Sequence, residues 1–262
     1  MLRRIISGFR RQDWTAVAIE LVVVVVGVFI GVQASNWNEQ RETDQKAEVF
    51  TARLKADLRK EAWMYELETG YLSQVLVNAK RAVDGLTGKA PVSDEALLIA
   101  AYRATQDYPY TRYSATYDQL TSTGQIGLIR DSALRELAMR VYTEPFLNQL
   151  GSPQQQSRDQ YRKAFRMALP YEIQEGLNKK CSDRVVRIGD YRGIAHMLDH
   201  PCATGLSPTA IAAGVARLRS DPQLVALLQL RIANVETNLV LLTTVWAPGY
   251  REPLRRLAQE QQ

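Results

Sequence analysis

Residues 14–37 read WTAVAIELVVVVVGVFIGVQASNW, and this apolar stretch decides how the rest of the chain is interpreted. As a helix it spans roughly 34 Å, at about 1.5 Å per residue. That length matches a membrane hydrocarbon core of about 30 Å. A tryptophan lies at each end, where an indole ring suits the membrane interface. The sequence therefore predicts a transmembrane helix over residues 14–37.

The charges on either side of this helix predict its orientation. Acidic residues predominate directly after the helix, whereas arginines precede it. These arginines are Arg3, Arg4, Arg10 and Arg11. Because positive charge favours the cytoplasmic side, we expect residues 1–13 to be a cytoplasmic basic tail and residues 38–262 to be a periplasmic domain. The predicted location is a bacterial inner membrane, crossed once and contacting lipid through the anchor.

A cleaved signal peptide is the alternative interpretation. Val32-Gln33-Ala34 fits the small-x-small cleavage pattern after an arginine-rich start. However, the apolar run is longer than that of a usual signal peptide. The polar residues 36–42, NWNEQRE, also continue without a helix breaker. We favour retention of the anchor.

The composition is that of an ordinary globular chain. Hydrophobic residues make up 46% and charged residues 23% of the 262 residues, which excludes disorder over most of the length. Two cysteines are too few for a disulfide scaffold or a four-thiolate zinc site. The net charge of +5 includes no long basic block, so we expect no nucleic-acid partner.

The chain after the anchor has helical patterning and no clear alternating strands. Residues 38–84 contain no proline and one glycine, Gly70, and their apolar residues recur mostly every three or four positions. This pattern predicts a long amphipathic helix that can continue the anchor and is interrupted near Gly70. Residues 170–206 are mixed. Further helices are expected after the capping residues Ser93, Asp131, Ser152, Ser207 and Asp221.

The final long helix, over residues 223–246, is apolar but contains Arg231 and Glu236. Because charged residues are costly inside a membrane, we expect a core helix rather than a second span. The predicted fold class is all-α, with an N-terminal transmembrane helix followed by a periplasmic helical bundle.

Two segments carry a resemblance to a known family. The first is the Glu-containing, Val-rich anchor that runs into Asn36-Trp37-Asn38-Glu39. The second is Thr116-Tyr117-Asp118-Gln119-Leu120, followed by Gly124. Both resemble an uncharacterised bacterial family of single-pass membrane proteins, a domain-of-unknown-function family. The resemblance lies within residues 1–145 and implies an uncleaved anchor, but it implies no activity.

One stripe of the anchor suggests a partner helix. Glu20, Gly27 and Gly31 share a helix face, and small residues let another helix approach closely. We expect this stripe to bind a second membrane helix, from another copy or from a different protein. In the alternative interpretation, Glu20 only reaches the lipid headgroups and the glycines are incidental.

The two cysteines, Cys181 and Cys202, flank a loop that contains glycine, aspartate and proline. In an oxidising compartment they most simply form one structural disulfide. The alternative is a reactive thiol, which needs a lowered pKa.

The tyrosine segment, residues 102–117, concentrates five of the twelve tyrosines. Its candidate ligand-binding residues are Tyr108, Tyr110, Arg112, Tyr113 and Tyr117. Rings with polar tips suit a binding surface for a glycan or a protein. They also suit the cover of a helical bundle where two helices meet, and we favour this second interpretation.

The remaining chemistry is sparse. His196 and His200 could chelate a metal from one helical turn, but the pair lacks the glutamate of the HExxH motif, and we favour a solvated helix end. Nucleophile-elbow and dinucleotide-binding motifs are absent from the sequence. We therefore expect no enzyme activity, metal or cofactor. The predicted function is a protein-interaction or scaffold module; the alternative is a ligand-sensing or envelope-binding domain that uses the tyrosine segment.

Overall fold

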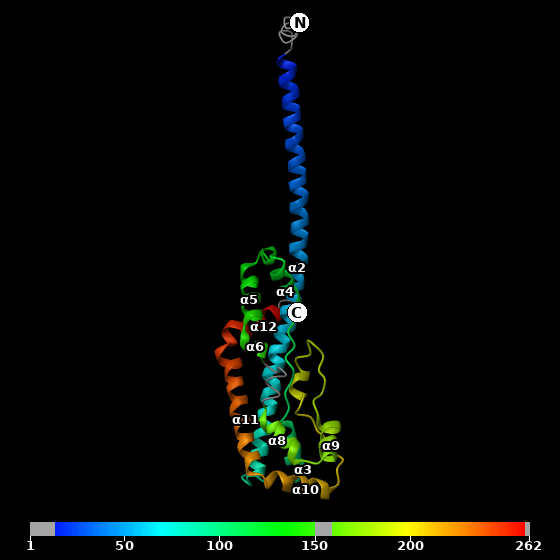
Figure 1. The fold of residues 1–262 in the computed structure, drawn as a ribbon, viewed down its shortest axis with the longest axis vertical. Helices are drawn as coiled ribbons and strands as arrows, with labels where there is room; N and C mark the ends of the chain where they lie inside the picture. The colour runs from blue at the N-terminus through cyan, green and yellow to red at the C-terminus, as the bar shows by residue number, and fades with distance from the viewer. Residues whose placement is uncertain (1–13, 150–158, 260–262) are drawn as a thin grey trace, which may run out of the picture. The chain divides into compact units, whose positions relative to one another are not determined.

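The computed structural model describes residues 14–149 and 159–259 (Figure 1). Every regular element in these ranges is a helix, which confirms the predicted all-α fold class. By its internal contacts the chain divides into two compact units. Unit 1 comprises Met1–Ala52 with Gly127–Arg130, and unit 2 comprises Arg53–Ile126 with Asp131–Gln262.

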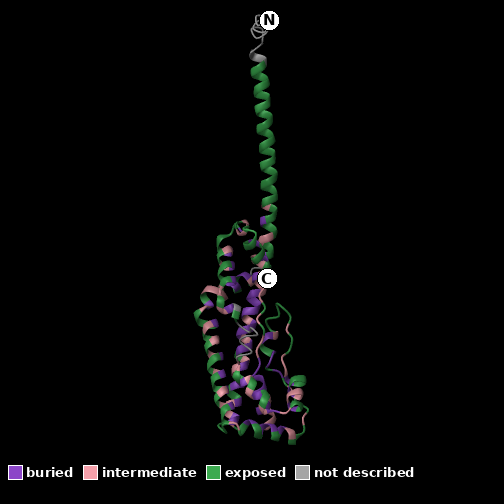
Figure 2. Cartoon of the chain, in the orientation of Figure 1, coloured by how far each residue is buried: buried purple, intermediate pink, exposed green. Residues whose placement is uncertain are grey.

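Helix α2, Trp14–Leu86, begins in unit 1 and supplies the central helix of unit 2. Its apolar side chains from Val17 to Val32 are exposed (Figure 2), so a long apolar N-terminal helix is present as predicted. The expected interruption near Gly70 is wrong, because the helix continues through that position. A Cβ at residue 70 would lie 2.5 Å from Ile194 Cγ2, so the glycine allows a close approach instead of breaking the helix.

Within unit 2, the buried residues of α2 include a stripe with alternating spacings of four and three. This heptad-like spacing keeps one face of a helix turned toward its neighbours. The stripe consists of Leu54, Leu58, Glu61, Tyr65, Glu68, Leu72, Val75, Ala79, Ala82 and Leu86. Trp63, Met64 and Leu67 are also buried, so other elements cover α2 on more than one side.

The other described elements follow in chain order. They are α3 (Asp94–Arg103), α4 (Ala115–Ser122), η1 (Ile126–Leu128), α5 (Ser132–Thr143), α6 (Pro145–Gln149), α8 (Gln160–Ala168), α9 (Tyr171–Cys181), η2 (Gly193–His196), α10 (Pro208–Arg219), α11 (Pro222–Val240), η3 (Leu241–Val245), η4 (Ala247–Arg251) and α12 (Glu252–Gln259). The η3 and η4 segments are π-helical turns.

Local capping explains where several of these helices begin. The side chains of Ser93, Asp131, Ser207 and Asp221 each accept a hydrogen bond from a backbone N–H in the first helical turn, as predicted. The predicted cap at Ser152 lies outside the described residues, and α8 is capped by Asp159. Residues 170–206, expected to be mixed, contain α9 because Ile173, Leu177 and Cys181 form a buried i, i+4 stripe.

One hydrophobic core cluster of unit 2 lies among the C-terminal end of α2 and helices α3, α8, α9, α10 and α11. Within residues 14–149 and 159–259, two helices are long and apolar enough to cross a membrane by length and composition, α2 and the segment Pro222–Val245. The second of them packs against α8 through a face that buries Leu224, Leu228 and Arg231. Of the most apolar window of this helix 22% is buried, so the expectation of a core helix rather than a second span stays a prediction.

Candidate functional site

The tyrosine segment is held against α2 by a buried carboxylate that sequence analysis did not select. Glu61 is fully buried. Its Oε1 accepts a hydrogen bond from the backbone N–H of Tyr113 at 2.6 Å, and its Oε2 accepts one from the Tyr110 hydroxyl at 3.2 Å. Arg112 Nη1 lies 3.4 Å from Glu61 Oε2. Burial raises the pKa of Glu61, and the charge of Arg112 opposes this rise.

Arg112 is itself enclosed by aromatic rings. Its guanidinium carbon lies 5.6 Å from the centre of the Tyr110 ring and 5.5 Å from that of Tyr142, and Nη2 donates to Val141 O at 2.6 Å. The Tyr142 hydroxyl donates to Tyr113 O at 2.9 Å. These cation–π and hydrogen-bond contacts join the segment to α5.

The other two candidate tyrosines also take part in ring contacts. Tyr108 lies 5.5 Å from Tyr71, and Tyr117 lies 5.0 Å from Tyr142, measured between ring centres. All five candidate ligand-binding residues are partly buried. The structure thus brings them together, but mainly in contact with α2 and α5. These contacts favour the bundle-covering interpretation, and a ligand role for the segment stays a prediction.

A second buried charged cluster joins four parts of unit 2. Arg231 of α11 donates to Asp107 Oδ1 at 2.5 Å, and its Nη1 lies 3.6 Å from Asp159 Oδ2. Arg162 Nη1 lies 3.6 Å from Asp107 Oδ2. The side chains of Arg231, Asp107 and Asp159 are each exposed by less than a tenth. Desolvation lowers the pKa of Arg231, but the charges of the two aspartates outweigh it and raise the pKa overall.

Glu68 of α2 lies next to this charged cluster and is only 3% exposed. Its Oε2 has no hydrogen-bond partner among the described residues. Burial raises the pKa of Glu68 to about 8, with a further contribution from the charge of Asp107. Glu68 is therefore mostly protonated at neutral pH.

The sequence contains a pattern that could have identified both glutamates as buried. Glu61 and Glu68 are seven residues apart and occupy two positions of the heptad-like stripe whose other members are Leu, Tyr, Val or Ala. A carboxylate in such a stripe must be paired or protonated, because burying an unpaired charge is costly.

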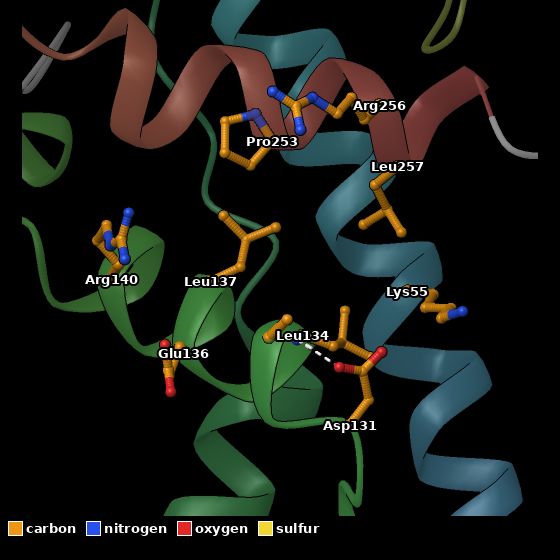
Figure 3. Close-up of a pocket in the computed structure, with 10 residues that line it drawn as sticks. Lys55, Asp131, Leu134, Glu136, Leu137, Arg140, Pro253, Arg256 and Leu257 are labelled. Atoms are coloured by element: carbon orange, nitrogen blue, oxygen red, sulfur yellow. Dashed lines mark hydrogen bonds between the residues drawn. The ribbon is translucent and has the colours of Figure 1, made fainter.

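Two of the surface grooves among the described residues of unit 2 are lined in part by α12. The first, of 370 Å³, lies between α5 and α12 (Figure 3). Leu134, Leu137 and Leu257 supply apolar surface there, and Lys55, Arg140 and Arg256 supply positive charge. Its other lining residues are Asp131, Ala133, Glu136 and Pro253.

The second groove, of 720 Å³, lies between α2, residues 191–195 and α12. Glu66 forms two hydrogen bonds with Arg251, of 2.8 and 2.7 Å, in its wall. The hydroxyls of Thr69 and Ser73 donate to backbone carbonyls of α2 at 2.8 Å. Both hydrogen bonds are made to the residue four positions earlier in the same helix.

The histidines are not arranged as a chelating helical pair. His196 ends η2 and is exposed, as expected. His200 lies beyond that helix and is buried, so the expected solvated helix end is wrong for His200. The Nε2 and Nδ1 atoms of His200 contact the carbonyls of Ser182 and Pro201 at 2.9 and 3.2 Å. Over residues 14–149 and 159–259, the structure contains no group of three or more side chains suited to a metal ion.

The predicted disulfide between Cys181 and Cys202 is present. It joins the end of α9 to the segment before α10 and closes a loop with a sequence separation of 21. In the chain-entropy description, closing such a loop stabilises the fold by about 3 kcal/mol.

We expect both thiols to resist alkylation in the native protein until a reductant is added. Cys181→Ser should lower the free energy of unfolding by about 2–4 kcal/mol. Denaturant unfolding of the oxidised protein and the variant measures this loss. After reduction the two proteins should have nearly equal stability. Quantitative labelling of both thiols without reductant would contradict the prediction.

The stripe predicted on the anchor lies in unit 1. Glu20 is exposed, and a Cβ added at Gly27 or Gly31 would meet nothing within 4 Å. Binding of a second membrane helix to this stripe stays a prediction.

The sequence model of a family of unknown function, DUF6090, matches residues 20–151. The match covers half of the chain. The chain belongs to this family. The finding confirms the resemblance to an uncharacterised family. The matched range includes Glu61 and Glu68, and also Tyr71 and Tyr142, which contact the tyrosine segment. Asp159 and Arg231 lie after the matched range. No curated protein and no solved structure matches the chain.

Proposed function

We propose that this DUF6090 member is a single-pass, membrane-anchored interaction module without catalytic activity. Residues 14–37 cross the inner membrane of a bacterium, residues 1–13 lie in the cytoplasm, and unit 2 contacts other proteins in the periplasm. The observation that carries the proposal is α2 itself. One helix contains a wholly exposed apolar segment and then the buried stripe of unit 2.

The arrangement of charged groups supports binding rather than catalysis. Glu61 and Arg231 are paired inside unit 2, where they hold elements together. The exposed apolar segment from residue 17 to residue 34 has the length and composition that favour insertion into lipid. A role of the tyrosine segment in ligand sensing remains the second hypothesis, and its partly buried rings give it less support.

Alkaline phosphatase fused after Gln262 should be active, because the enzyme requires the periplasm and the arginines before the anchor favour the cytoplasm. A cytoplasm-dependent reporter at the same site should be inactive. The phosphatase activity reports the topology. An immunoblot against an N-terminal tag on the fusion reports whether the anchor is retained.

Charge variants provide the control for this topology. Replacement of Arg3, Arg4, Arg10 and Arg11 by lysine should preserve the reporter pattern, since the charge is kept. Replacement by glutamine, with arginines added after Trp37, should shift activity toward the cytoplasmic reporter. Activity of only the cytoplasmic reporter in the unchanged chain would overturn the proposed orientation.

A further inference from the structure

Residues 184–192, RVVRIGDYR, form an exposed loop between α9 and η2 that we name the basic loop (Figures 1 and 2). Three of its apolar side chains are exposed, whereas Val186 is half-buried. Val185 is 95% exposed, Ile188 52% and Tyr191 43%. Three exposed apolar side chains within one short loop provide apolar surface that a partner protein can cover.

The basic loop carries a net positive charge. The structure gives Arg184, Arg187 and Arg192 no ion-pair partner within 4.0 Å in the described ranges. The loop's one acidic residue, Asp190, accepts a hydrogen bond from the backbone N–H of Gly193 at 2.9 Å. The loop therefore presents three unpaired guanidinium groups beside exposed apolar side chains.

The base of the loop is fixed to unit 2, and two backbone hydrogen bonds order its tip, from Asp190 N to Arg187 O at 3.0 Å and from Tyr191 N to Gly189 O at 3.1 Å. The Cys181–Cys202 disulfide closes the chain segment that contains the basic loop. The backbone N–H of Arg184 donates to Met197 O at 3.0 Å. Gln74 of α2 donates to Ile194 O at 2.7 Å and accepts from Leu198 N at 2.8 Å. Ordering of a loop before binding reduces the entropy that association must overcome.

The second groove extends this surface. Tyr191 lines the groove together with Arg251 and Arg255. Arg251 is engaged by Glu66 through two hydrogen bonds, whereas Arg255 contacts Glu66 at 3.4 Å and its side chain is 50% exposed. The positive, partly apolar surface thus continues from the basic loop to α12.

We propose that the basic loop and the adjoining groove dock an acidic segment of a partner protein that also presents apolar side chains. Carboxylates of the partner pair with the arginines, and its apolar side chains cover Val185, Ile188 and Tyr191. Interfaces combine tyrosine and arginine in this way, and complementary charge speeds encounter and sets specificity. The inference rests on the proposed interaction function and gives it a surface and a partner chemistry.

Site-specific photo-crosslinking tests this docking surface in the full-length chain in its own membrane. The photoreactive residue p-benzoylphenylalanine replaces Ile188 or, as a matched control, Leu230, whose exposure is 51%. Position 188 should yield a discrete protein adduct and position 230 should not. Mass spectrometry of the adduct should place the crosslink in a partner segment rich in Asp and Glu beside apolar residues.

Charge reversal then tests the proposed pairing of partner carboxylates with the arginines. Arg187→Glu, combined with the photoreactive residue, should lower the adduct yield at least tenfold. Arg217→Glu, at an exposed arginine of α10, should leave it unchanged. Changing the crosslinked partner's carboxylates to arginine should restore the adduct of Arg187→Glu. An unchanged melting temperature establishes that each variant is folded.

Several outcomes would overturn the inference. They are equal adducts at 188 and 230, a partner segment without acidic residues, adducts with lipid only, and no effect of Arg187→Glu. Protein adducts at other exposed positions but not at 188 would refute the docking surface and leave the interaction function standing. A lack of protein adducts at every exposed position of unit 2 would refute both.

Discussion

Replacing Arg231 by methionine should lower the free energy of unfolding by about 3–5 kcal/mol. Methionine keeps most of the side chain's apolar volume but removes the charge. Asp107 and Asp159, whose side chains are exposed by less than a tenth, would then lack their shared partner on α11. The loss is large because Asp107 keeps only the more distant Arg162, at 3.6 Å, and Asp159 loses its ion pair with Arg231 while both carboxylates stay buried.

Denaturant unfolding in a mild detergent, followed by tryptophan fluorescence, measures the effect. Arg219→Met provides the matched control, because the Arg219–Asp94 pair is 3.7 Å long and both side chains are nearly half exposed. An exposed pair contributes at most about 1 kcal/mol. Addition of Asp107→Asn to Arg231→Met should recover part of the loss, since it removes a buried carboxylate that has lost its closest partner. A loss below that of Arg219→Met would contradict the proposed role of Arg231.

The helix starts could be predicted because capping is local. Ser93, Asp131, Ser207 and Asp221 each bond to a backbone N–H only two or three residues ahead. The sequence within one turn therefore contains all the required information. The disulfide was also predictable, because the chain has two cysteines and one possible pair.

The charged clusters could not be predicted in the same way. Glu61 meets Tyr113 from 52 positions away, and Arg231 meets Asp107 from 124 positions away. Such pairs depend on how helices pack, and an isolated glutamate in a helix is usually at the solvent face. The grooves and the basic loop likewise depend on tertiary packing. In the sequence, the basic loop shows only three arginines interspersed with valine, isoleucine and tyrosine.

Glu68→Gln should remove a large pH dependence of stability. Burial raises the pKa of Glu68 from the ordinary 4.5 to about 8, and the charge of Asp107 adds to the rise. Between pH 4.5 and about pH 8, the folded protein holds a proton on Glu68 that the unfolded chain has released. Stability from this group is therefore complete below about pH 4.5 and is lost as the pH rises toward 8.

The size of this loss follows from the width of the pH window. At about 1.4 kcal/mol per pH unit, the free energy of unfolding falls by roughly 3–5 kcal/mol from pH 4.5 to 8 through Glu68. Glutamine has nearly the same shape and stays neutral throughout. The variant should match the unsubstituted protein near pH 4.5 and exceed its stability by that amount at pH 8.

The measurement is the difference in unfolding free energy between Glu68→Gln and the unsubstituted protein, taken at intervals across this pH range. Other titrating groups are shared by the two proteins, so most of their contribution cancels in the difference. Glu48→Gln, at an exposed position of the same helix, is the control and should give a nearly constant difference. A constant difference for Glu68→Gln as well would mean that Glu68 is ionised in the folded protein. In that case the unpaired Oε2 must have a compensating partner, and the account of this buried position would be wrong.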